Sequence, residues 1–182
     1  MPFAYYQRLS AARKRIYRRS DEIRRLDLPA DDEVAGLVAR LRDRLAADDR
    51  AGVQKAAQAL VDRLAAGYRV PAIRVRVLAC RPSDKSGELY GLYRPDAGGP
   101  AQISVWMRTA AKKQVVAFKT FLRTLVHEVC HHLDYELFKF ADSFHTEGFY
   151  SRESALASAL LAMDAPTAPA AAGVTDPQQR LF

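Results

Sequence analysis

Cysteine and long apolar runs are both scarce in this sequence, and each scarcity excludes a class of protein. Only Cys80 and Cys130 are cysteines among 182 residues, and their spacing fits neither a disulfide framework nor a zinc ribbon. No apolar run approaches the ~20 residues of a membrane-spanning helix, and the amino terminus carries charge without the apolar stretch of a secretory signal. We therefore expect a cytoplasmic protein without membrane contact, whose two cysteines are reduced and buried.

Histidine is also rare, whereas positive charge is abundant. All four histidines lie between positions 127 and 145, and the net charge is +7. Such a charge favours an acidic partner, with nucleic acid first among the candidates. The length suits one domain with extensions, and 49% apolar with 27% charged residues is typical of a globular chain.

Residues 1–67 are expected to form a basic helical region. Residues 3–26 combine apolar positions at helical spacing with many arginines, which predicts a basic amphipathic helix. A second helix is expected after Pro29, where apolar residues recur at helical spacing from Val34 to Leu45. A third is expected from about Val53 to Ala66, ended by Gly67.

After Pro71 the apolar period changes from that of a helix to that of a strand. Alternating segments at 73–77, 89–93 and 103–107 predict a small, mostly antiparallel sheet of three or more strands. The helical period returns from about residue 114 to 137 and again at 147–162. The fold class is therefore α+β, with residues 68–163 as the core and residues 164–182, rich in Pro and Ala, as a disordered tail.

The helix expected at 114–137 contains the segment His127-Glu128-Val129-Cys130-His131. Positions four apart lie on one face of a helix, so His127 and His131 can direct ring nitrogens to one metal ion, which we expect to be zinc. Glu128 is offset by one position and would act as general base toward a zinc-bound water. This pattern predicts a zinc peptidase.

A catalytic zinc normally has three protein ligands, so one more ligand is expected outside this helix. His145 is the candidate, because the connection after the helix is long enough to turn back over the metal. A carboxylate ligand, Glu153 or Glu147, is the alternative.

The other residues near the motif are not expected to bind the metal. His132 lies about 100° around the helix from His131, so it is expected at the surface or behind a ligand rather than on the metal. Asp134 is either an acceptor that orients a ligand histidine or a solvated acid. Cys130 faces the apolar side. The group that stabilises the oxyanion is left open among Tyr135, Tyr150 and Arg152.

Over residues 72–162 the chain resembles the SprT-like metallopeptidases, a zincin group that includes the Spartan protease. The resemblance covers the strands, the helix with its His-Glu-x-x-His motif, and His145 followed four residues later by Phe149. This last pair is similar to the family's His-Gly-x-x-Phe, although Thr146 stands where the family usually has glycine. No cysteine-rich zinc ribbon follows.

The resemblance implies a zincin-like fold, in which a small sheet packs on the active-site helix. It also implies that His145 is the third zinc ligand and that the protein is an endopeptidase. Residues 102–107 would be the edge strand, to which an extended substrate peptide adds as a further strand. Specificity would then be loose, because backbone pairing recognises shape more than side chains.

The last five residues, Gln178-Gln179-Arg180-Leu181-Phe182, resemble the Gln-x-x-Leu-Phe peptide with which bacterial polymerases and repair proteins bind the DNA sliding clamp. Leu181 and Phe182 would fill an apolar pocket, and Gln178 would hydrogen-bond at its rim. An accidental Leu-Phe terminus is the alternative. The basic helix at 3–26 offers a second route to DNA through phosphate contacts, unless its charges are merely solvated.

Together these features predict a zinc-dependent endopeptidase that acts on DNA-associated or DNA-crosslinked proteins. Two alternatives remain open: a cytosolic zincin that cleaves a specific regulator unrelated to DNA, and a non-catalytic zincin-fold module that recruits partners. The presence of Glu128 favours catalysis, since a pure scaffold needs no general base beside the metal.

Overall fold

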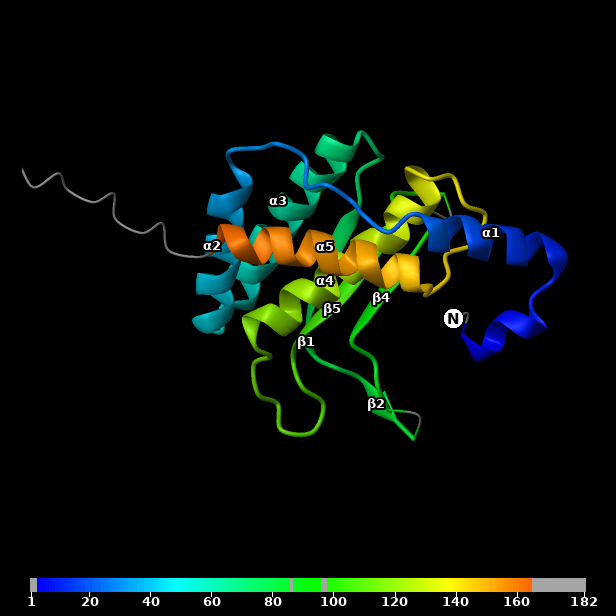
Figure 1. Ribbon diagram of the computed structural model, residues 1–182. Coiled ribbons are helices and arrows are strands. Elements are labelled where there is room, and N and C mark those ends of the chain that lie inside the picture. Colours follow the sequence, from blue (N-terminus) through cyan, green and yellow to red (C-terminus); the bar gives the residue numbers. More distant parts are fainter. Residues whose placement is uncertain (1–2, 86, 96–97, 165–182) are drawn as a thin grey trace, which may run out of the picture.

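Five α-helices and a small sheet make up the part of the chain that the computed structural model describes, residues 3–85, 87–95 and 98–164 (Figure 1). A mixed α and β fold is therefore confirmed. The helix α5 runs across the molecule between α1 at one end and α2 at the other, and it packs against both. In chain order the elements are η1 (Ala4–Arg8), α1 (Ala11–Glu22), α2 (Val34–Ala46), α3 (Arg50–Tyr68), β1 (Arg74–Cys80), β2 (Ser83–Asp84), β3 (Gly87–Glu88), β4 (Gly91–Arg94), β5 (Gln102–Arg108), α4 (Phe118–Glu136) and α5 (Glu147–Met163).

The basic N-terminal segment contains two short helices rather than the single one expected at residues 3–26. Ser10 separates them, because its backbone is extended and its hydroxyl accepts a hydrogen bond from the Arg13 amide (3.3 Å) at the start of α1. This is the usual role of a serine at a helix N-cap. The helix α1 ends at Glu22, where Ile23 takes an extended conformation.

The helices α2 and α3 agree with the two patterns expected after Pro29, with small differences at the ends. Asp49 caps α3, and its carboxylate accepts the Gly52 amide at 2.9 Å. The helix continues past Gly67 to Tyr68, and Arg69 closes it in the left-handed conformation (φ 56°). A left-handed residue after the last turn is a common helix stop.

The main sheet has the strand order β1-β5-β4, so the small sheet is confirmed but its pairing is mixed. The strand β1 pairs with β5 in parallel, and β4 pairs with β5 antiparallel. The expectation that residues 102–107 form an edge strand is wrong, because β5 is the central strand. Its five middle residues are all buried, as expected of a strand covered on both faces. A separate two-stranded ribbon is formed by β2 and β3.

The outer edge of β1 is occupied by two side chains of α3. Gln58 bonds the Ile73 carbonyl and the Val75 amide, both at 2.8 Å, and Gln54 bonds the Val75 carbonyl at 2.8 Å and the Val77 amide at 2.7 Å. Four helical residues rise about 6 Å, close to the rise of two strand residues, so the two glutamines match the strand's repeat. These contacts cover one sheet edge, and β4 forms the other.

One buried apolar cluster joins α2 and α3 to the sheet, α4 and α5. The helix α4 contributes the stripe that the sequence predicted, and its buried apolar members are Phe121, Leu122, Leu125, Val126, Val129, Cys130 and Leu133. This stripe fixes the rotation of α4 about its axis. The polar positions between its members are thereby turned toward β4 and the loop after α4.

The described part of the chain ends at residue 164. Residues 165–182 lie outside the described residues, and with them the expected tail and its clamp-binding residues Gln178, Leu181 and Phe182. Among the described helices, none has both the length and the apolar character that crossing a membrane requires.

Candidate metal centre

Three histidines from two parts of the chain meet beside α4. His127 and His131 lie one turn apart on α4, with their Nε2 atoms 3.2 Å apart. His145 comes from the loop between α4 and α5, and its Nε2 lies 3.0 Å from that of His127 and 3.1 Å from that of His131. The three side chains lie close enough together to hold a metal ion.

The triangle of nitrogens has the size that a small ion needs. Two nitrogens that each lie about 2.0–2.1 Å from a tetrahedral ion are separated by about 3.3–3.4 Å. The observed separations of 3.0–3.2 Å are only a few tenths of an ångström shorter. Three ring nitrogens this close without a cation would place three lone pairs or N–H groups against one another. The arrangement therefore fits a bound cation.

The ring of His127 is oriented from behind by a carboxylate. Its Nδ1 lies 2.9 Å from Oε2 of Glu153, which comes from α5. An ionised carboxylate only accepts hydrogen bonds, so Nδ1 carries the proton and Nε2 presents a lone pair. Glu153 thus supports a ligand instead of replacing one, and Glu147 pairs with Arg24 at 3.7 Å. The two carboxylates considered as alternative ligands lie outside the histidine cluster.

The ring of His131 is oriented by a longer chain of groups. Its Nδ1 lies 2.8 Å from the hydroxyl of Ser143, and this hydroxyl donates to Oδ2 of Asp134 at 2.7 Å. Since the serine proton points to Asp134, the His131 Nδ1 proton points to the serine and Nε2 is left with its lone pair. Arg152 holds the other oxygen of Asp134 at 2.8 Å, and both side chains are fully buried.

The acceptor role considered for Asp134 is therefore present, but it acts through Ser143. Sequence reasoning missed both Ser143 and this role of Arg152. Neither residue stands at a helical spacing from the motif, so no periodic signal marks them.

Burial keeps two of the three histidines in the neutral form that binds metal. Burial lowers the pKa of His131 to about 3, and the neighbouring His127 and His145 add to the effect. Burial also lowers the pKa of His145, with a smaller contribution from His127. Neutral imidazole is the ligand form of histidine, so these side chains need not lose a proton before they bind an ion at neutral pH.

Glu128 lies between α4 and the edge strand β4. Its side chain is buried, and its carboxylate accepts a hydrogen bond from the backbone amide of Tyr93. A Cβ at Gly91 would collide with this carboxylate, so a side chain there would displace Glu128 from its place under β4. Burial raises the pKa of Glu128 to about 7, against the opposing effect of His127. A bound dication would lower this pKa again.

Comparisons with protein-family models, curated proteins and solved structures give no match to this chain. The SprT-like assignment thus stays a prediction, and the function has to be inferred from the geometry of the site.

A hollow lies on each side of Glu128, along β4. One has a volume of about 450 Å³ and is bordered by Leu89 and Tyr90 before β4 and by Thr120 and Thr124 on α4. The other, of about 280 Å³, is bordered by residues on and after β4 and by the loop that carries His145. His127 and Glu128 line both hollows, so the candidate metal centre opens to each of them.

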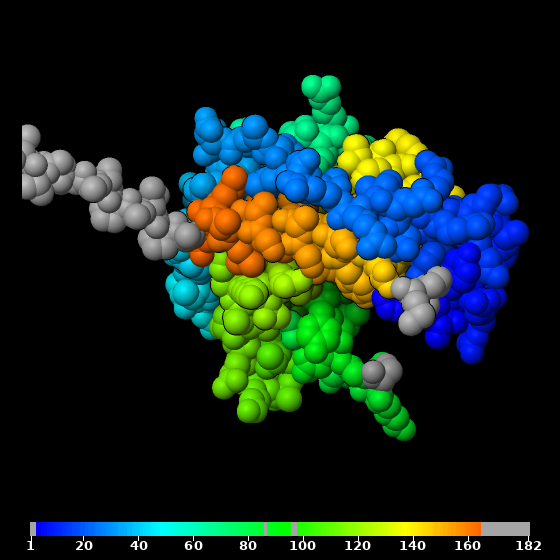
Figure 2. Space-filling view, viewed as in Figure 1, coloured from blue at the N-terminus to red at the C-terminus, as the bar shows by residue number. Residues whose placement is uncertain are grey.

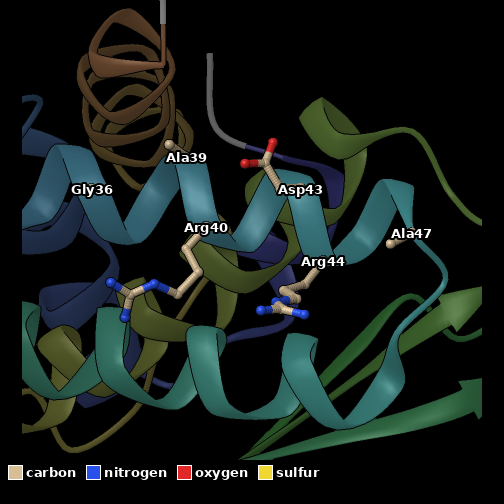
Figure 3. A pocket seen from close by; sticks show the side chains of 6 residues that line it. All are labelled: Gly36, Ala39, Arg40, Asp43, Arg44 and Ala47. Carbon is tan, nitrogen blue, oxygen red and sulfur yellow. The ribbon is translucent and has the colours of Figure 1, made fainter.

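Further hollows lie along α2, but they lack the chemistry of the histidine cluster. The one in Figure 3 has a volume of about 360 Å³, and its described lining belongs to one face of α2. Its polar side chains there are Arg40, Asp43 and Arg44, and Arg44 is paired with Asp49 at 3.2 Å. This lining offers charge but neither histidine nor cysteine.

His132 is not a surface residue. It is 1% exposed, with Nδ1 3.0 Å from the Tyr93 hydroxyl and Nε2 3.0 Å from the Pro71 carbonyl. The carbonyl only accepts, so Nε2 donates to it and Nδ1 accepts from the tyrosine. His132 therefore ties α4 to β4. Cys130 is a free, fully buried thiol, as expected, whereas Cys80 is a free thiol that is only partly buried, contrary to the expectation for it.

The three residues considered for the oxyanion have different surroundings. Arg152 is fully buried and donates to the Ser20 carbonyl (2.6 Å), the Ile23 carbonyl and Asp134, so it cannot reach a substrate. Tyr135 lines the smaller hollow together with the three histidines. Tyr150 stacks on the ring of His145, with centroids 5.7 Å apart.

Proposed function

We propose that this protein is a zinc-dependent endopeptidase of the SprT-like kind that acts on DNA-associated or DNA-crosslinked proteins. The observation that supports it most is the triangle of Nε2 atoms, with sides of 3.0–3.2 Å, beside a buried carboxylate and an edge strand. Each of these parts has a role in the hydrolysis of an extended peptide.

His127, His131 and His145 would hold the ion. Three neutral imidazoles suit zinc, and a catalytic zinc keeps its remaining coordination position open. When bound, zinc supplies a Lewis acid that polarises a carbonyl oxygen and lowers the pKa of water to about 7. Glu153 and Ser143 keep the rings of His127 and His131 aimed at the ion.

Glu128 is the proton acceptor. Its carboxylate lies beside the metal ligands, where a bound ion would favour the ionised form, and this form can take a proton from the attacking water and return it to the leaving amine. The Tyr93 amide fixes the carboxylate against β4, and Gly91 leaves the space it occupies. The proton acceptor and the edge strand to which the substrate would add are thereby held next to each other.

The substrate would add to β4. This replaces the earlier expectation for residues 102–107, because β5 is covered by a strand on each side. The Gln54 and Gln58 contacts occupy the edge of β1, so a peptide would add at β4, the sheet edge near the metal, beside the Tyr93 amide that Glu128 already holds. An extended peptide presents side chains to alternate faces, and the two hollows beside Glu128 would take those of the residues flanking the cleaved bond.

The basic N-terminal segment supports DNA as the partner that presents the substrate. Residues 3–26 contain eight lysines and arginines but only two acidic residues, in a chain of net charge +7. Arg13 of α1 pairs with Asp142 of the loop that carries His145, and Arg24, just after α1, pairs with Glu147 at the start of α5. DNA bound along α1 would bring proteins attached to it close to the metal. The binding of DNA should weaken as the salt concentration rises.

The central test compares two glutamate variants on the same helix. Glu128→Gln should retain zinc and the fold but lose about 10²–10⁴-fold in cleavage rate, because the proton acceptor is gone. Glu136→Gln is the matched control, since Glu136 lies at the end of α4 and pairs with Lys139 at 2.9 Å. Zinc content and cleavage of a protein–DNA adduct are measured. Equal rates for the two variants would rule out this mechanism.

Two further measurements address the partners. The cleavage rate is measured with and without DNA at increasing salt concentrations. A rate that changes with neither DNA nor salt indicates a peptidase that cleaves a regulator unrelated to DNA. Deleting residues 178–182 should abolish binding to a sliding clamp and leave cleavage of a free peptide intact. If the intact protein does not bind a clamp, the proposed role of Gln178, Leu181 and Phe182 is wrong.

A further inference from the structure

His145 belongs to a loop with little regular structure of its own. Between α4 and α5 the chain makes a few short-range backbone bonds, such as Phe140 to the Asp134 carbonyl (2.9 Å) and Thr146 to the Phe144 carbonyl (2.8 Å). The carbonyl of His145 itself accepts a hydrogen bond from the hydroxyl of Tyr5, at 3.0 Å. A residue 140 positions earlier in the chain thus holds the backbone of the third histidine.

Tyr5 is held in place by neighbouring aromatic rings. It stacks on Phe3 with centroids 6.1 Å apart, meets Tyr17 edge-on at 6.0 Å and lies over Phe144 at 6.4 Å. Tyr17 is 1% exposed and anchors this group. The ring of Tyr5 is 37% exposed, and its contacts with these three rings do not depend on its hydroxyl.

The rest of the N-terminal segment contacts both this loop and the first turn of α5, which follows it. Arg13 donates to Asp142 through Nε at 2.8 Å, and its guanidinium lies over the Phe144 ring. In the first turn of α5, the Gly148 amide donates to Asp21 at 2.9 Å. A Cβ on Gly148 would collide with the carbonyls of α1, so the two backbones are in direct contact there. Figure 2 shows this segment, in blue, packed against the beginning of α5.

We propose that Tyr5 is a positioning residue for the third metal ligand, and that the N-terminal segment is thereby a working part of the metal centre. The rings of His127 and His131 are oriented through their Nδ1 atoms by Glu153 and Ser143. His145 is oriented through its backbone by Tyr5. This inference rests on the metal site of the proposed function, and it adds a residue from outside the region that resembles the SprT-like family.

Tyr5→Phe tests the proposal, because it keeps the ring and removes the hydroxyl. Tyr6→Phe is the matched control: its ring packs edge-on against Tyr17 at 4.9 Å, next to the same cluster. The dissociation constant for Zn²⁺, measured by competition with a chelating dye, should rise about 3- to 10-fold in Tyr5→Phe and stay unchanged in Tyr6→Phe. This lies at or below the lower end of effects seen for groups that support ligands directly, since Tyr5 acts through the backbone.

A double-variant cycle separates positioning from general stabilisation. If Tyr5 acts through His145, then Tyr5→Phe should not weaken Zn²⁺ binding further in a His145→Ala background. Additive losses, or a lower unfolding midpoint of the metal-free protein with unchanged Zn²⁺ affinity, would overturn the proposal. Failure of the wild type to bind Zn²⁺ would instead overturn the proposed function. The two failures are therefore distinguishable.

Discussion

The two sides of the candidate metal centre are built in different ways. On the helix side, His127, Glu128 and His131 are positioned by consecutive turns of α4, whose apolar stripe fixes their direction. On the loop side, His145 stands in a segment whose place depends on contacts with α1, η1 and α5. The comparison teaches that half of one small site follows from local geometry and the other half from contacts across the whole chain. The variants that follow disturb one side of the site or the contacts that join the two sides.

The largest effect is expected at the residue that joins the two sides. Arg152→Met removes the partner of the fully buried Asp134 and the donor to two carbonyls of the N-terminal segment. Leaving that carboxylate unpaired should cost about 3–5 kcal/mol of unfolding free energy. Urea unfolding of the metal-free protein measures it. Arg123→Met is the control, since its ion pair with Glu153 is half exposed and should contribute at most about 1 kcal/mol.

The double variant Arg152→Met with Asp134→Leu should regain part of the lost stability, because it no longer buries an unpaired charge. If Arg152→Met is no more destabilising than Arg123→Met, the buried pair does not connect the two sides.

A smaller effect is expected where the loop side supports the helix side. Ser143→Ala removes the acceptor of the His131 Nδ1 proton and should weaken zinc binding about 10–100-fold. Ser151→Ala is the control, because its hydroxyl bonds only the backbone of Glu147 within the same helix. Metal affinity is measured by chelator competition. An unchanged affinity in Ser143→Ala would mean that α4 alone orients His131.

The smallest effect is the pH dependence of the metal-free protein. Burial lowers the pKa of His131 to about 3 in the folded state, against about 6.5 when unfolded. The unfolded state therefore binds more protons below pH 6.5, so this stability is present above that pH and is lost as the pH falls. The contribution of His131 to the slope should approach about 1.4 kcal/mol per pH unit, while Glu128, whose pKa is raised to about 7, contributes with the opposite sign, so the comparison with a His131 variant isolates the histidine.

Urea unfolding at pH 7.5, 6.5 and 5.5 with a chelator present checks this slope. His131→Gln should make it shallower, because the variant has no group there to protonate. A wild-type slope equal to that of His131→Gln would show that burial on the helix side does not hold His131 neutral.

Much of the fold was predictable wherever a pattern was local. The α4 stripe, the capped helices and the segments of alternating residues all follow from period and capping chemistry. The order of the strands in the sheet was not predictable, since the apolar alternation of residues 102–107 is the same in a central strand as at an edge. The interruption of the N-terminal helix at Ser10 was not predictable either, because a single serine competes with a strongly helical composition on both sides.

The sequence by itself determined the helix side of the site, because spacing of four on a helix places His127 and His131 together whatever surrounds them. The tertiary structure decided that His145 meets them, that Glu128 lies under β4 rather than β5, and that Ser143 and Tyr5 hydrogen-bond to His131 and to the His145 carbonyl. Those contacts join residues 12 to 140 positions apart, and no repeat in the chain records such distances. Only the packing of α1, α4, α5 and the sheet around one core brings them into reach.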